Sequence, residues 1–351
     1  MTHLWVRAES RANEERVGIT HDGVARLLAL GFAVTIEDSP TRVIPTEDYR
    51  QAGATIVPEG SWRDAPEDAI VFGLKELPDD GTPLRHRHVM FGHAYKGQGA
   101  GQRLLARFAA GGGALYDLEY LVDDTGRRVA AFGYWAGYAG AAISALAWAA
   151  QRKGRTCPPV TTWPNADAML SECRTALSDS PRPDALVIGA LGRVGTGVRD
   201  LCAALDIPVT AWDMAETASG GPFPEVLRHG LFFNCILAAP GVPVFVPRDA
   251  GTRDRALRVI GDIACDPDSD YNPVPVYDRA TDWTAPVLRV HDAPPLDVMA
   301  IDNLPSLLPR ESSDDFAAQL LPHLETLDRL DAGVWGRARE TYETHKKETG
   351  A

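Results

Sequence analysis

The sequence is poor in cysteine and in basic residues, and both shortages restrict what the protein can be. The five cysteines are odd in number and form no CxxC pair, which argues against a disulfide framework or a zinc site. The chain has 35 Lys and Arg against 48 Asp and Glu, so its net charge is −13. Such a chain repels nucleic acid and anionic membranes. An anionic small molecule can bind only where basic residues converge locally.

Long hydrophobic runs are also scarce. The one long uncharged segment, 129–151, is rich in alanine and glycine rather than leucine. We therefore expect a buried helix against which other parts of the backbone pack closely, and we expect no membrane span. We see no signal peptide, so reduced thiols in a cytoplasm are expected. At 351 residues, with 45% hydrophobic content, the chain is typical of a two-domain globular protein.

Strand-like and helix-like segments alternate through both halves of the chain. The alternation predicts an α/β protein with two Rossmann-like, doubly wound parallel sheets. In the first half we expect strands at 3–6, 32–36, 69–72, 89–91 and 114–118 and helices at 23–30 and 102–110. In the second half we expect strands at 185–188, 209–212, 231–238 and 257–263, with helices over 312–347 broken at Pro322.

Two predicted strands of the first half end in polar blocks. Lys75 lies in Gly-Leu-Lys-Glu after the first strand, and His93 lies in Gly-His-Ala-Tyr-Lys after the next. Neighbouring parallel strands deliver such residues to one crevice, which suits a proton-transfer pair or a cationic clamp. Taken alone, they could equally be a salt-bridged lysine and a core histidine. Residues 86–88, His-Arg-His, lack a carboxylate or cysteine that would complete a metal site, so we expect a surface loop and no metal.

A glycine-rich turn opens the second half. Ile-Gly-Ala-Leu-Gly-Arg-Val-Gly, residues 188–195, lies between a predicted strand and a predicted helix with the spacing GxxGxxG. Glycines allow a tight turn, and the helix N-terminus binds pyrophosphate. Asp213 ends the next strand, where an acid holds a ribose diol and repels a 2′-phosphate. The pattern predicts NAD rather than NADP; the alternative is a plain glycine turn beside a solvated aspartate.

Longer strings carry a resemblance to one enzyme family. They are VRAES, ERVGIT, EDSPTRVIPTEDYRQAGATIVPEGSW, GLKELP, LYDLEYL, GRRVAAFGYWAGYAGAA, GALGRVGTG, ETASGGPF and IDNLPSLLPRESS. Over nearly its whole length the chain resembles the NAD-dependent, lysine-forming saccharopine dehydrogenases of the wider alanine dehydrogenase and transhydrogenase family. Such enzymes oxidise the secondary amine that links lysine to glutarate, and water cleaves the resulting imine into lysine and 2-oxoglutarate.

The resemblance implies roles for individual residues. Lys75 and His93 would share the acid–base work, with His93 serving imine hydrolysis and Lys75 the amine. Substrate binding is implied for Arg16, Glu76, Lys96, Glu119, Arg128, Phe132 and Asp266, of which Arg16, Lys96 and Arg128 would bind carboxylates. Cofactor binding is implied for Arg127, Gly192, Arg193, Asp213, Thr217, Ile263, Ile301, Asp302, Asn303 and Leu304.

The resemblance also implies a domain arrangement. Residues 1–131 plus 309–351 would form a substrate and catalytic domain, residues 132–308 an NAD-binding domain, with the active site in the cleft between them. It further implies a monomer. Val194 stands where fungal members have a cysteine, which excludes a disulfide with Cys235. Two alternatives stay open: an opine-type dehydrogenase that joins another amine to a 2-oxo acid, and a non-catalytic NAD-binding sensor. Metabolic direction stays open too, because the reaction is reversible.

Overall fold

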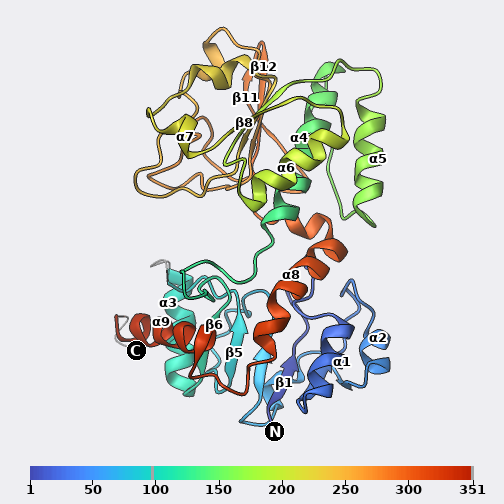
Figure 1. The fold of residues 1–351 in the computed structure, drawn as a ribbon, viewed down its shortest axis with the longest axis vertical. Helices are drawn as coiled ribbons and strands as arrows, with labels where there is room; N and C mark the ends of the chain where they lie inside the picture. Colours follow the sequence, from blue (N-terminus) through green and yellow to red (C-terminus); the bar gives the residue numbers. More distant parts are fainter. Residues whose placement is uncertain (96–98, 349–351) are drawn as a thin grey trace. The chain divides into compact units, whose positions relative to one another are not determined.

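The computed structural model of the protein describes residues 1–95 and 99–348 (Figure 1). The chain divides into two compact units, and each is described here by itself. Unit 1 comprises Met1–Ala131 and the chain from Ser312 onward, and unit 2 comprises Phe132–Glu311. The chain therefore passes from unit 2 back to unit 1 at 311/312, whereas the sequence places this crossover at 308/309.

Unit 1 is built on a six-stranded parallel sheet with the strand order β3-β2-β1-β4-β5-β6. Its strands are β1 (His3–Val6), β2 (Ala33–Glu37), β3 (Thr55–Val57), β4 (Ile70–Phe72), β5 (Arg87–Met90) and β6 (Ala114–Asp117). Its helices are α1 (His21–Ala29), α2 (Thr46–Gln51), α3 (Gly99–Gly111), α8 (Pro309–Leu324, which begins in unit 2) and α9 (Gly333–Glu348), with a 3₁₀ turn, η1 (Ser61–Asp64). The strand order reverses between β1 and β4, which is where ligands bind in such sheets.

Unit 2 is built on a second six-stranded sheet with the order β11-β12-β10-β9-β7-β8. Its strands are β7 (Ala185–Ile188), β8 (Val209–Trp212), β9 (Leu231–Asn234), β10 (Val259–Asp262), β11 (Leu288–Asp292) and β12 (Pro295–Met299). Its helices are α4 (Gly133–Arg152), α5 (Ala166–Ala176), α6 (Arg193–Ala204) and α7 (Met214–Thr217), with 3₁₀ turns η2 (Pro224–Arg228), η3 (Ala250–Thr252) and η4 (Leu304–Leu307). The order reverses between β7 and β9.

The predicted fold class, α/β with two doubly wound sheets, is confirmed, and two details were wrong. Strand β11 runs antiparallel to β12, so the second sheet is not wholly parallel. The predicted break at Pro322 does not occur there, because α8 continues to Leu324. Pro322 lies in the last turn, so it removes the one hydrogen bond that its own N–H would donate, and the helix ends two residues later.

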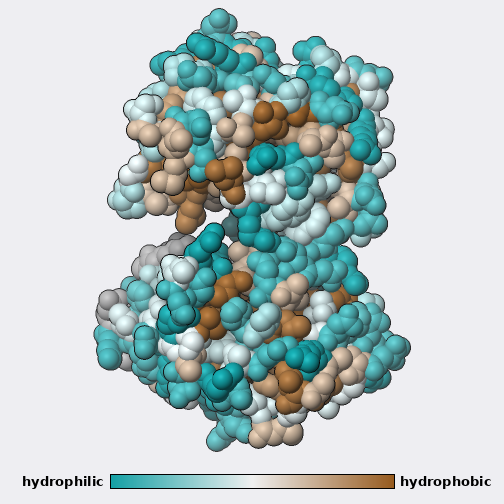
Figure 2. Space-filling model, viewed as in Figure 1, coloured by the Kyte–Doolittle hydropathy of each residue, from teal (hydrophilic) through white to brown (hydrophobic). Residues whose placement is uncertain are grey.

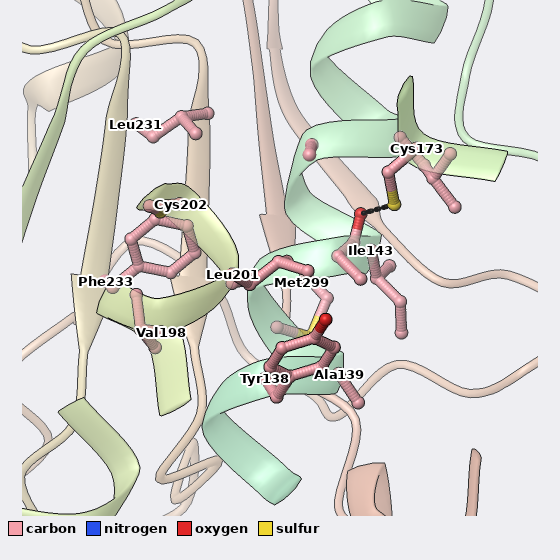
Figure 3. Close-up of a cluster of buried hydrophobic side chains, with 14 of the residues drawn as sticks. Tyr138, Ala139, Ile143, Cys173, Val198, Leu201, Cys202, Leu231, Phe233 and Met299 are labelled. Carbon is pink, nitrogen blue, oxygen red and sulfur yellow. Dashed lines mark hydrogen bonds between the residues drawn. The ribbon is translucent and has the colours of Figure 1, made fainter. Parts of the chain in front are cut away.

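Alternating residues of β7 serve two separate cores. Ala185 and Val187 face a core formed with α4, α5 and α6, whereas Leu186 and Ile188 face the opposite core. The first core includes Ile143, Leu201 and Phe233, and in it the Cys173 thiol donates to the Ala142 carbonyl (Figure 3). Burial on both faces explains why this strand is apolar without interruption.

The uncharged segment forms α4, and its glycines allow α6 to approach closely. A Cβ atom at Gly137 would lie 1.9 Å from the Val194 carbonyl oxygen. A Cβ atom at Gly197 would lie 2.0 Å from the Tyr134 carbonyl oxygen. Both contacts are with backbone, so the two helices pack at a distance that only glycine permits. In the described part of the chain, no helix has the length and hydropathy of a membrane span. The view in Figure 2 shows a largely hydrophilic surface with separate apolar patches.

The prediction of a surface loop at 86–88 was wrong. His86 and His88 are buried on β5, where Trp62 and Phe108 contact the His88 ring edge-on at centroid distances of 5.2 and 5.4 Å. Among the described residues, neither ring nitrogen of His88 has a hydrogen-bond partner. Burial is the main cause that lowers the pKa of His88 well below 6.5, and the cations Arg7 and Arg107 lower it further. The segment looks polar in sequence, but packing holds the neutral imidazole in the core.

This histidine predicts an acid-sensitive stability. The unfolded chain takes up a proton near pH 6.5, whereas folded His88 stays neutral, so the free energy of unfolding falls as the pH drops below 6.5. Between about pH 7.5 and pH 5.5 the loss from this group is about 1.4 kcal/mol. Chemical denaturation at both pH values should show a smaller loss for His88→Leu than for wild type. An equal loss in the two proteins would contradict a neutral, buried His88.

Candidate active site

Lys75 follows β4 and is held by two residues that follow β1. The Glu9 carboxylate accepts the Leu74 N–H at 2.6 Å and the Lys75 N–H at 3.0 Å. Arg7 donates to the Lys75 carbonyl and contacts Glu9 at 3.2 Å. Since Arg7 and Glu9 are both buried or nearly so, they fix the lysine backbone at the point where the strand order reverses.

A second buried ion pair lies near Lys75. Arg16 donates from Nε and Nη2 to the two oxygens of Glu14, at 2.8 and 2.6 Å. Burial alone would raise the pKa of Glu14, but Arg16, and to a smaller extent the Lys75 ammonium, lower it. Glu14 is therefore ionised and stabilises a positive charge on Lys75. Arg16, expected to bind a substrate carboxylate, is buried and already engaged with Glu14 in this way.

His93 follows β5, and Glu119 follows β6. The His93 Nδ1 atom lies 3.4 Å from Oε2 of Glu119, and the exposed fractions of the two side chains are 45% and 14%. Arg128 contacts the other Glu119 oxygen at 3.6 Å and donates to the Glu119 carbonyl at 3.1 Å. Phe91 stacks on the His93 ring at a centroid distance of 6.3 Å. The site therefore contains an accessible imidazole with a carboxylate at one nitrogen, an arrangement suited to proton transfer.

The other predicted substrate contacts are more dispersed. Glu76 is exposed and lies 3.7 Å from Arg11. Lys96 lies outside the described residues. Phe132 and Asp266 are partly exposed residues of unit 2, at the start of α4 and after β10. In unit 1 the structure thus brings together Lys75 with Arg16, and His93 with Glu119 and Arg128.

In unit 2 the glycine turn joins β7 to α6. Gly189 has a φ of 86°, and a Cβ atom at Gly195 would lie 2.2 Å from the Gly189 carbonyl oxygen. Gly192 is the N-cap of α6 and brings no side chain over the first turn, while Arg193 is exposed beside it. A turn this tight at a helix N-terminus can hold a pyrophosphate. The backbone therefore fits the predicted dinucleotide.

Asp213 ends β8 beside this turn. Its Oδ2 atom accepts the Leu191 N–H at 3.0 Å, and its Oδ1 atom accepts the Met214 N–H at 3.0 Å. Thr217 donates its hydroxyl to the Asp213 carbonyl at 3.0 Å. Leu191, Met214 and Leu237 follow β7, β8 and β9 and are 77%, 82% and 64% exposed. Exposed apolar side chains around an acidic strand end suit a flat ring with a ribose attached.

The remaining predicted cofactor residues differ in accessibility. Ile263, Ile301 and Leu304 have their side chains in the core, so any contact they make with a cofactor would be through backbone atoms. Asp302 is exposed and Asn303 partly so. Arg127 belongs to unit 1, and its N–H donates to Asp123 at 3.0 Å. Among the described residues, no group of three or more histidine, cysteine or acidic side chains could hold a metal.

The sequence interpretation missed Arg7, Glu9 and Glu14. Arg7 and Glu9 lie within the string VRAES and Glu14 just precedes ERVGIT, yet none of the three received a role. An available signal was their position, because charged residues directly after the first strand of a doubly wound sheet lie where the strand order reverses.

The fold and site define the class of protein. The family model of the alanine dehydrogenase/PNT N-terminal domain matches residues 5–139. A solved L-alanine dehydrogenase has a TM-score of 0.69 with 18% identity, covering 97% of this chain and 94% of that one. A transhydrogenase from Sinorhizobium meliloti has a TM-score of 0.64 with 17% identity, covering 95% and 97%. At these identities the likeness establishes the fold of two Rossmann-type domains.

Closer relatives establish the family. The chain is 45% identical to saccharopine dehydrogenase (NAD+, L-lysine-forming) of Schizosaccharomyces pombe, over 97% of this chain and 98% of that protein. It is 44% identical to the protein of the same name from Neurospora crassa, over 97% and 96%. The chain belongs to the family of NAD-dependent, lysine-forming saccharopine dehydrogenases.

Proposed function

We propose that this protein is an NAD-dependent saccharopine dehydrogenase that forms L-lysine. The reaction converts saccharopine, NAD+ and water into L-lysine, 2-oxoglutarate and NADH, and it is reversible. The observation that carries the proposal is the identity of 45% with a relative of that name over nearly the full length of both chains. The site in unit 1 supports it, because an accessible imidazole, His93, and the Arg128 guanidinium contact the two oxygens of Glu119.

The two units divide the work. Unit 2 holds NAD through the 189–192 turn, Arg193 and Asp213, and the carboxylate of Asp213 favours NAD over NADP by repelling a 2′-phosphate. NAD held there would supply the hydride acceptor for the amine carbon, and the substrate amine would become an imine. Unit 1 supplies the proton-transfer groups and most of the substrate-binding residues, while Phe132 and Asp266 belong to unit 2. The family resemblance also implies that Arg127, although it belongs to unit 1, contacts the cofactor.

Lys75 and His93 carry the proton transfers. Lys75 takes the proton of the secondary amine and then stabilises the charge of the intermediates, aided by ionised Glu14. His93 removes a proton from the attacking water and returns it to the departing lysine amine. Glu119 at Nδ1 orients the ring for this exchange. Arg128 and Lys96 bind substrate carboxylates, and we propose that the protein works as a monomer.

One assay separates this function from its alternatives. Purified protein, NADH, 2-oxoglutarate and L-lysine should give steady NADH oxidation, with much weaker turnover when NADPH replaces NADH. Turnover with ornithine or another amine, and none with lysine, would favour an opine-type dehydrogenase. NADH binding without turnover on a panel of amines and 2-oxo acids would identify a sensor.

A further inference from the structure

Asp117 lies at the centre of the proton-transfer site and has no role in the proposed chemistry so far. It is the last residue of β6, and its side chain is almost wholly buried. Its Oδ1 atom accepts the Glu119 N–H at 2.9 Å, whereas its Oδ2 atom lies against Gly92 and, among the described residues, has no hydrogen-bond partner. One buried carboxylate therefore lies between the loop that carries His93 and the loop that carries Glu119.

The backbone at His93 needs such support. His93 has a φ of 49°, a left-handed conformation that side chains other than glycine rarely adopt. Residues are held in this region only when their surroundings fix them, and they are frequent at functional sites. Gly92, directly before it, would place a Cβ atom 3.2 Å from Oδ2 of Asp117 and 2.6 Å from a methyl group of Leu115. Glycine at this position therefore lets the carboxylate come close to the strained turn.

The charged groups around Asp117 come from both loops. His93 and Tyr95 belong to the segment after β5, and Glu119, which contacts Arg128, belongs to the segment after β6. Burial raises the pKa of Asp117 to about 6, with the Glu119 charge adding to the rise and the Glu119 and Gly92 N–H groups and His93 opposing it. The carboxylate is thus ionised at neutral pH and becomes protonated in mildly acidic solution.

We propose that Asp117 is a positioning residue for the proton-transfer pair: its ionised carboxylate holds the Glu119 backbone and attracts a positive charge on His93, so that His93 Nδ1 faces Glu119. Protonation weakens the hydrogen bond from Glu119, because a carboxylate accepts N–H groups more strongly than a carboxylic acid does, and it also removes the attraction for His93. The catalytic consequence rests on the proposed function. The contact of Asp117 with the two loops does not depend on that function, and it can be measured without turnover.

The test compares wild type with Asp117→Asn and Asp117→Ala. In wild type, the amide resonances of Gly92 and Glu119 should titrate together near pH 6, and this titration should vanish in both variants. At pH 8, kcat/KM for lysine should fall at least about tenfold in Asp117→Asn and further in Asp117→Ala, since loss of alignment weakens proton transfer. The Kd for NADH should stay unchanged, and the acid limb of the wild-type pH profile near pH 6 should disappear in Asp117→Asn.

Asp184→Asn is the matched control. Asp184 also accepts a backbone N–H, from Gly230 at 2.8 Å, but it lies at the start of β7, away from the site. This variant should keep wild-type kcat/KM and pH dependence. The proposal is overturned if the two amides do not titrate, or if folded Asp117→Asn keeps wild-type turnover and the same acid limb. If wild type shows the titration but turns over no amine, the proposed function is overturned, whereas the contact of Asp117 with the two loops is supported.

Discussion

His93→Gln is expected to lower kcat for NADH oxidation by about 10²- to 10⁴-fold, the usual contribution of a general acid–base group. Glutamine can still donate and accept hydrogen bonds, but it cannot carry a proton between water and the departing amine. The Kd for NADH should remain within about twofold of wild type, because the residues proposed to hold the pyrophosphate and ribose lie in unit 2. Steady-state kinetics and NADH fluorescence titration measure the two quantities.

His21→Gln is the control for this experiment. His21 is a partly exposed histidine of the same unit, at the first position of α1, and it contacts Asp22 at 3.6 Å. The substitution should leave kcat unchanged. If His93→Gln keeps near wild-type turnover, the proton shuttle has been assigned to the wrong residue, and the contact between His93 and Glu119 is structural.

Gly137→Ala is expected to cause a large loss of stability in unit 2. The new Cβ atom would lie 1.9 Å from the Val194 carbonyl oxygen, so α4 and α6 must separate. Because the obstacle is backbone rather than a flexible side chain, the cost should reach about 3 kcal/mol, the upper end of ordinary overpacking. Since α6 begins at the glycine turn, NADH binding should weaken as well. Chemical denaturation and NADH titration test both effects.

Gly133→Ala in the same helix is the matched control. Its methyl group would lie 3.2 Å from Cγ2 of Val194, a side-chain contact that a small adjustment relieves. The free energy of unfolding should therefore change little in this variant. Equal stability of Gly137→Ala and wild type would show that the packing of α4 against α6 is looser than described.

The fold class could be predicted because its signals are local. The apolar segments 69–72 and 89–91 are each followed by a glycine, and the alternation with helices requires parallel pairing. Parallel pairing of these neighbours places Lys75 and His93 at the same edge of the sheet. The antiparallel β11 was not predicted, since its pairing depends on a short turn to β12 and its residues are only partly buried.

The supporting groups of the site were harder to predict. Arg7, Glu9 and Asp117 act through backbone N–H and carbonyl groups of residues far along the chain, and no spacing in the sequence records such contacts. The sequence predicts a loop at His88 because no carboxylate or cysteine completes a metal site with residues 86–88. The burial of His88 depends on Trp62 and Phe108, which come from other elements. Pairings of this kind become visible only once the sheet is assembled.

The central claim is that the protein oxidises saccharopine and cleaves the product to lysine. The most direct measurement is to incubate the purified protein with saccharopine and NAD+ and to quantify every product by mass spectrometry and absorbance. The account predicts lysine, 2-oxoglutarate and NADH in equal amounts. His93→Gln should form all three far more slowly than wild type. NADH formation without lysine, or no reaction at all with saccharopine, would contradict it.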